Sequence, residues 1–235
     1  FYYFNIIYMD PKFLKNNENY KNLLEKINYK IIVCRYNECI NWLYNDLSNC
    51  FIYNTGPKLN ISNEINIENV GREANVYLKY IIDNYNNLPD IIVFTQAKIS
   101  DHLTRHGFLQ KNNIMFLYQL IFEANINKKS LHQAWYKKSN NLCCWSHDWN
   151  KYFCKSLKYK NDKFIIFSDW FEEHINKPYP HDIMYIYRNA IFAVKKELIL
   201  KHSFEYYKKL INEVNYFSNP IESHFFERSW YYIFN

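Results

Sequence analysis

The sequence predicts an α/β domain of three layers, in which a mostly parallel central sheet is covered by helices on both faces, as in Rossmann-like folds. Short apolar runs alternate along the chain with segments of helical periodicity. Two of the runs, residues 31–35 (IIVCR) and 91–95 (IIVFT), are apolar almost throughout, which is typical of strands buried on both faces of a parallel sheet. Because 235 residues fit one core and no internal repeat or linker divides them, we expect a single domain over residues 1–235.

In the first half of the chain, each expected element follows from its apolar spacing and from the residues that end it. The run at 50–53 predicts a second strand, which the turn residues Gly56 and Pro57 end. Residues 72–85 repeat apolar side chains every three or four positions, so they predict an amphipathic helix that stops before Pro89. In order, we expect strands at 31–35, 50–53 and 91–95, and helices at 38–45, 72–85 and 108–123.

The second half is interrupted by residues 127–163, a polar, aromatic and aperiodic segment. We interpret it as an insertion or an acceptor-facing loop region, because long irregular segments in compact domains often carry binding residues. Beyond it, apolar runs predict strands at 164–167 and 184–194, and amphipathic segments predict helices at 204–214 and 221–234.

Composition excludes several classes of function. The chain has only 3 Gly and contains neither GxGxxG nor GxxxxGK[ST], so a glycine-rich phosphate loop is excluded. No run approaches 18 apolar residues, so we expect no membrane span. The formal charge is +6, but Lys and Arg are scattered and form no basic groove interleaved with aromatic side chains, so we expect no nucleic-acid partner. The 6 Cys form no CxxC pair, which favours free thiols in a reducing compartment and thus the cytoplasm.

Polar side chains follow the first and third strands, where α/β sheets bind ligands. Arg35, Tyr36, Asn37 and Glu38 follow the first strand, and Gln96, Ala97 and Lys98 follow the third, with His102 and Arg105 a few residues later. An alternative interpretation makes Asn37 the cap of a helix and Glu38 a favourable charge in its first turn.

Four segments of the sequence resemble one family. They are RYNE after the first strand, residues 69–97 (NVGREANVYLKYIIDNYNNLPDIIVFTQA), NAIFAVKKELI at 189–199 and ESHFFERSWYYIF at 222–234. The family is the domain of unknown function 3431, found in fungi and large DNA viruses, and the resemblance covers about residues 31–234. For a viral member, the expected location is the host cytoplasm or the virus factory.

The layout also resembles the GT-A glycosyltransferases, whose Rossmann-like fold binds sugar nucleotides. RYNE is similar to their Asn-Glu pair after the first strand, and IFAVKKELI is similar to the segment that precedes their acidic catalytic helix. Their DxD metal motif, however, corresponds here to Thr95-Gln96-Ala97. A neutral amide cannot replace two carboxylates as ligands of Mg²⁺ or Mn²⁺. The resemblance therefore implies an enzyme that needs no metal cofactor, in which cationic side chains neutralise the leaving diphosphate.

The resemblance also assigns candidate residues. In FFERSW, Glu227 is the expected catalytic base and Glu222 the second candidate, although Glu227 could instead form an ion pair. Glu73 could be structural, bind the ribose or act as a base. The cations considered for the diphosphate are Arg72, Lys98, Arg105, Arg188 and Arg228, of which Lys98 and Arg105 could equally be solvated surface charges. The expected nucleotide-sugar-binding residues are Arg35, Asn37, Glu38, Arg72, Glu73, Gln96, His102 and Arg188.

These features together predict a glycosyltransferase that moves a sugar from a nucleotide-sugar donor to a glycan or glycoprotein acceptor. We expect it to bind no nucleic acid and to require no metal. The alternative is a carbohydrate-binding or virion-surface domain of the same fold that has no catalytic activity, which the missing DxD would permit.

Overall fold

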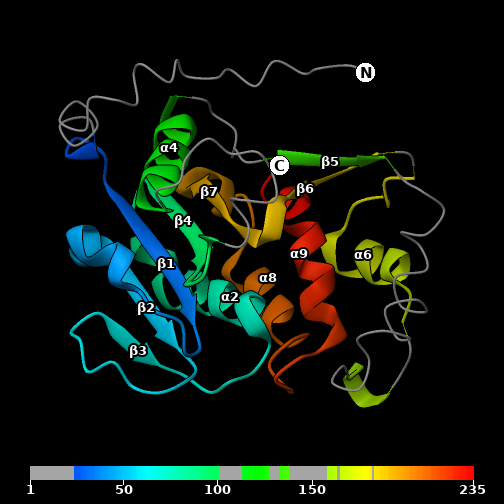
Figure 1. The fold of residues 1–235 in the computed structure, drawn as a ribbon. Helices are drawn as coiled ribbons and strands as arrows, with labels where there is room; N and C mark the ends of the chain where they lie inside the picture. Colours follow the sequence, from blue (N-terminus) through cyan, green and yellow to red (C-terminus); the bar gives the residue numbers. More distant parts are fainter. Residues whose placement is uncertain (1–23, 101–112, 127–132, 138–157, 163–164, 182) are drawn as a thin grey trace.

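The central sheet of the computed structural model has five strands in the order β3–β2–β1–β4–β7 (Figure 1). The first four run parallel and β7 is antiparallel to β4, so the expected mostly parallel sheet is confirmed. The structure describes residues 24–100, 113–126, 133–137, 158–162, 165–181 and 183–235. The strands of this sheet are β1 (Tyr29–Arg35), β2 (Cys50–Asn54), β3 (Glu64–Asn66), β4 (Ile91–Gln96) and β7 (Phe192–Lys195).

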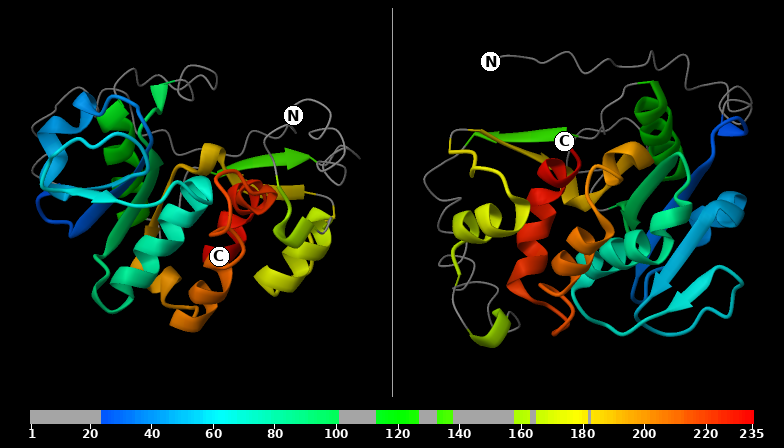
Figure 2. Two further views of the ribbon diagram at one scale, coloured as in Figure 1. Left: turned by 90° about the horizontal axis from the view of Figure 1, so that it is seen from below. Right: turned by 180° about the vertical axis from the view of Figure 1, so that it is seen from behind.

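Helices cover both faces of the sheet, which gives the expected three layers (Figures 1 and 2). Alternate residues of the strands face opposite sides: Ile32 packs under α2, α8 and α9, whereas Ile31 and Val33 pack under α4 and η2. The helices are η2 (Asn41–Asn49), α2 (Arg72–Asn84), η3 (Tyr85–Asn87), α4 (Asn113–Ile126), η4 (Lys160–Asp162), α6 (Phe167–Ile175), η5 (Arg188–Ala190), α7 (Lys196–Ile199), α8 (Phe204–Ile211) and α9 (Ile221–Phe234).

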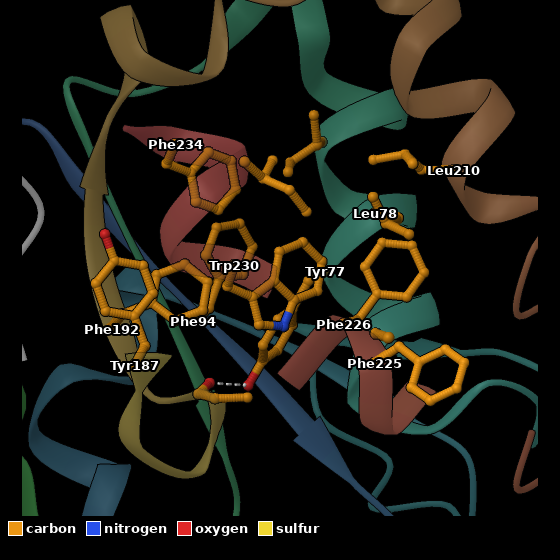
Figure 3. Packing of buried hydrophobic residues seen from close by; sticks show 14 of the residues in the cluster. Tyr77, Leu78, Phe94, Tyr187, Phe192, Leu210, Phe225, Phe226, Trp230 and Phe234 are labelled. Carbon is orange, nitrogen blue, oxygen red and sulfur yellow. Dashed lines mark hydrogen bonds between the residues drawn. The ribbon is translucent and has the colours of Figure 1, made fainter. Parts of the chain in front are cut away.

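A large cluster of buried aromatic side chains fills the core between α2, α9 and the sheet (Figure 3). Tyr77 is at its centre, with ring centroids 4.7 Å from Phe94 and 5.8 Å from Trp230. Trp170 of α6 is also fully buried, 5.4 Å from Phe225. These rings, including that of Trp170, fill the space between helices and sheet.

Several elements differ from those expected. Residues 38–45 do not form an α-helix; a 3₁₀ helix, η2, begins at Asn41 instead. The strand expected at 164–167 is wrong, because Phe167 begins α6 and its ring packs with Trp170 and Phe171, three and four positions later. The strand expected at 184–194 is two strands, β6 (Ile183–Tyr187) and β7, separated by η5. β6 pairs with β5 (Gln133–Lys137) in a second, two-stranded sheet.

The loops that follow β1 and β2 lie in close contact at Gly56. A Cβ atom at this position would overlap the backbone carbonyl of Tyr36, so only glycine fits. We expect Gly56→Ala to lower the free energy of unfolding by about 3 kcal/mol, because a backbone must shift to relieve the overlap. Urea unfolding measures this change. Ser62→Ala, at an exposed position of the same connection, is the control and should shift stability by less than about 0.5 kcal/mol. Equal midpoints for the two variants would contradict the close packing.

Candidate functional site

The candidate site is the edge of the main sheet where β1 and β4 end. Because β2 lies on one side of β1 and β4 on the other, the connections from these two strands diverge at this edge, which is where open α/β sheets bind ligands. The first turns of α2 and α9 meet here. Gly71, just before α2, donates its N–H to the carbonyl of Phe217 at 2.8 Å, and Ser223 Oγ of α9 donates to the carbonyl of Gly71 at 2.9 Å. Gly71 has a φ of 64°, which favours glycine.

Arg35, at the end of β1, forms hydrogen bonds with the neighbouring loops. Its Nε donates to the carbonyl of Glu38 at 2.9 Å, and its Nη1 donates to the carbonyl of Pro57 at 2.9 Å and to Asn54 Oδ1 at 2.8 Å. Asn54 in turn donates its Nδ2 to Glu64 Oε1 at 2.6 Å, so the side-chain amide connects the guanidinium to a carboxylate. Arg35 is 7% exposed, and the structure gives it a structural role in addition to any contact with a ligand.

The Tyr36–Glu38 loop is held by its own carboxylate. Glu38 Oε2 accepts from the backbone N–H of Tyr36 at 2.8 Å and of Asn37 at 3.1 Å. Asn37 does not cap a helix, because the following helix begins only at Asn41 and Ile40 occupies its cap position. The interpretation of this segment as a helix start is therefore wrong. Asn37 is exposed beside the carboxyl end of β1.

Gln96 holds the turn that joins the two sheets. Its Nε2 donates to the carbonyl of Asn189 at 3.1 Å, and Tyr77 donates its hydroxyl to the carbonyl of Ala190 at 3.0 Å, the contact drawn in Figure 3. Asn189 and Ala190 both have positive φ, 55° and 53°.

Three of the predicted residues cannot be placed. The described part of the structure does not include the side chain of Arg188, in the same turn, or any part of His102 and Arg105. Lys98 is exposed just after β4.

Arg72 begins α2 with a φ of 51°, an unfavourable conformation for a residue with a side chain. Among the described non-glycine residues with positive φ, all except Arg72 and Ala190 are asparagines, and these two lie at the candidate site. Strained backbone of this kind is common at functional sites. The Arg72 guanidinium is 3.4 Å from Glu73 Oε2, 3.3 Å from Asn219 Oδ1 and 3.5 Å from His224 Nε2. The charge of Glu73, followed by that of Glu227, raises the pKa of Arg72.

Glu227 is ionised and paired. Its Oε2 is 3.0 Å from Nη1 of Arg228, and its side chain remains 21% exposed. Burial would raise the pKa of Glu227, but the charges of Arg228 and Arg72 outweigh it and hold that pKa below its ordinary value.

His224 is one turn earlier on the same face of α9. Burial and then the charge of Arg72 lower the pKa of His224 to about 3, so the imidazole is neutral at pH 7.

Glu222 has other contacts. It is 1% exposed, and it accepts from the hydroxyl of Tyr216 at 2.7 Å and from the backbone N–H of Lys160 at 3.2 Å. Burial raises its pKa. These bonds fasten η4 to the start of α9, and they make Glu222 the less suitable of the two candidate bases.

The structure thus brings Arg72, Glu73 and Glu227 together and adds groups that the sequence did not single out. Tyr77 lies near this group, and burial followed by the charge of Glu73 raises its pKa. The spacing of His224 before Glu227 and Arg228 on a helix could have identified the imidazole. No sequence pattern identifies the other added groups, which are Asn219, Tyr77 and Cys34.

The described residues contain no group of three or more His, Cys, Asp or Glu side chains arranged to hold a metal ion.

Comparison with known proteins gives one result. A family model described as a protein of unknown function (DUF3431) matches residues 31–235. The chain belongs to this family. No curated protein and no solved structure matched the DUF3431 chain. Within the described ranges of the DUF3431 chain, no helix combines the length and the apolar character needed to span a bilayer.

Proposed function

We propose that this DUF3431 protein is a glycosyltransferase that moves a sugar from a nucleotide-sugar donor to a hydroxyl group of a glycan or glycoprotein in the cytoplasm. The observation that carries the proposal is the meeting of an ionised, partly exposed Glu227 with Arg72 and Arg228 at the edge where β1 and β4 end. A carboxylate beside two guanidinium groups at this edge suits a reaction in which a hydroxyl loses a proton and a diphosphate leaves.

In the proposed reaction, the acceptor oxygen forms a bond to the anomeric carbon of the donor while the bond from that carbon to the diphosphate breaks. Glu227 takes the proton of the acceptor hydroxyl. The nucleoside diphosphate leaves with the electron pair of the broken bond, and Arg72 and Arg228 stabilise its negative charge. The balance of one proton and one leaving group requires no oxidant or reductant.

The proposal that no metal takes part rests on the position equivalent to DxD. Gln96 is neutral, and its amide is directed to the backbone carbonyl of Asn189. Thr95, before it, is fully buried in β4. Neither side chain is a suitable ligand for Mg²⁺ or Mn²⁺ bridging a diphosphate. In the absence of such ligands, guanidinium groups are the means by which this edge would bind the diphosphate.

The nucleoside of the donor would lie over the ends of β1 and β4, beside Asn37 and Gln96. Arg35 and Glu38 would act mainly by shaping the loop that faces it, since their side chains bond to backbone groups of that loop. Glu73 could bind the ribose hydroxyls. His102 and Arg188 remain proposed contacts of the nucleotide-sugar.

Calorimetric titration with a panel of nucleoside diphosphates, with and without Mn²⁺, tests the proposed function. We expect one or more members to bind with an affinity that Mn²⁺ leaves unchanged. Binding that requires Mn²⁺ would contradict the metal-independent reaction, and binding to no member would overturn the transferase. Glycan binding without turnover of any nucleotide sugar would instead support a carbohydrate-binding or virion-surface domain of the same fold.

A further inference from the structure

Arg72 presents a cationic group to solvent at the candidate site. Its side chain is 40% exposed although Nε and Nη1 are both engaged by protein groups. Nη2 has no hydrogen-bond partner among the residues that the structure describes. The guanidinium is thus oriented by its neighbours and retains donors for an anionic ligand.

His224 is in contact with this guanidinium. It is 4% exposed, and its Nε2 is 3.5 Å from Nη1 of Arg72 and 3.2 Å from Oδ1 of Asn219. With the hydrogen on Nε2, the ring donates to Asn219 Oδ1, which also accepts from Arg72. Arg228 donates to the backbone carbonyl of His224 at 2.8 Å. The imidazole is therefore buried near two cations, which disfavour a third positive charge.

We propose that Arg72, oriented by Asn219 and His224, binds the diphosphate of the donor, and that this binding makes His224 easier to protonate. The inference rests on the proposed function for the identity of its ligand. His224 acts in it as a positioning residue, since its ring reaches the ligand only through Arg72.

The easier protonation follows from the balance of charge around the imidazole. In the free protein, burial and then the charge of Arg72 keep the ring neutral. A bound diphosphate diester brings two negative charges to Arg72 and reverses the sign of the local field. Glu227 raises the pKa of His224 in the free protein, but burial and the charge of Arg72 outweigh it, and its carboxylate is paired with Arg228 at 3.0 Å. Among the residues that the structure describes, the charged and titratable groups near His224, Arg72 and Glu227 include Cys34, Glu73, Tyr77 and Arg228.

The test uses dimethyl diphosphate, which carries the two charges of the donor's diphosphate but no base and no sugar, and which does not itself titrate in the range studied. The ring resonances of the histidines are followed by NMR from pH 8 to pH 4 in the full chain, and those of His224 are identified by their loss in His224→Gln. We expect the ring to remain neutral down to about pH 4 without the probe. With saturating probe, we expect its midpoint to rise by about one pH unit or more.

Matched variants assign the effect to Arg72. Arg72→Gln should weaken the affinity for the probe by about tenfold or more and remove the change in the His224 titration. Arg72→Lys, which keeps the charge but loses the planar fork, should bind the probe with intermediate affinity. Lys79→Gln removes an exposed cation from the same helix, where Lys79 pairs with Asp83, and should leave both measurements unchanged.

Two results would overturn the inference: an unchanged His224 titration at saturating probe, or equal affinities of Arg72→Gln and Lys79→Gln. Neither result depends on transfer activity. If the probe binds as expected but no nucleotide sugar is turned over, the diphosphate site stands and the proposed function fails. If nucleotide sugars are turned over with no loss of donor affinity in Arg72→Gln, the proposed function stands and the inference fails.

Discussion

Glu227→Gln should lower the turnover of the transfer reaction by about 10²-fold or more, because Gln keeps the size and hydrogen-bonding groups of the side chain but cannot accept the proton of the acceptor hydroxyl. The affinity for the donor should change little, and any change should be toward tighter binding, since a negative charge beside Arg72 is removed. Initial rates at saturating donor and acceptor, together with calorimetric donor affinities, measure both quantities.

Glu222→Gln is the matched control. Glu222 is on the same helix, but its bonds go to Tyr216 and Lys160, so its replacement should affect turnover much less than that of Glu227. Glu227→Asp keeps the carboxylate and should retain part of the activity. Full turnover in a folded Glu227→Gln protein would place the base elsewhere, with Glu222 or Asp182 as the next candidate; Asp182 lies outside the described residues.

Acid should destabilise the protein through His224. Its pKa in the folded state is about 3, against about 6.5 for an unperturbed histidine in the unfolded chain. Between these values the unfolded chain binds more protons, so stability falls as the pH decreases from about 6.5 toward 3. The loss is about 1.4 kcal/mol per pH unit, or roughly 5 kcal/mol over the whole range. Above pH 7 this contribution to the pH dependence is absent.

His224→Gln should remove this acid sensitivity. On lowering the pH from 7.5 to 4.5, the wild-type protein should lose about 3 kcal/mol more unfolding free energy than the variant does. Urea unfolding at the two pH values measures the change. His181→Gln, at an exposed histidine, is the control for the loss of an imidazole at the surface. A wild-type protein and a His224→Gln variant with the same pH dependence would contradict the burial of a neutral imidazole beside Arg72.

The sequence predicts the central strands and the two site helices well, because their signals are local. β1 and β4 are continuous apolar runs, and the apolar spacing of α2 and α9 repeats over three to four turns. The run at 164–167 misleads for the same reason, since four apolar residues suit a strand or the start of a buried helix equally. Phe167 joins α6 because Trp170 and Phe171 complete a helical face that packs on α9.

The candidate site is less accessible to prediction because its contacts join distant parts of the chain. The sequence places Arg72 at a helix start and Glu227 in the last helix, but nothing local shows that the two meet. Arg72 contacts Asn219 and His224 only because Gly71 and Ser223 bind the first turns of α2 and α9 together. Likewise, the commitment of Arg35 to carbonyl groups in two loops depends on the pairing of β1 with β2.

The turn at Arg188–Ala190 joins the two sheets beside the candidate site. β6 and β7 are consecutive in the chain but belong to different sheets, so this turn is the short covalent connection between them. Gln96 and Tyr77 clamp its two carbonyl groups in a backbone conformation that costs about 1 kcal/mol or more at Ala190. Side chains of β4 and α2 thus hold the short connection through which β6 of the second sheet joins β7 of the main sheet.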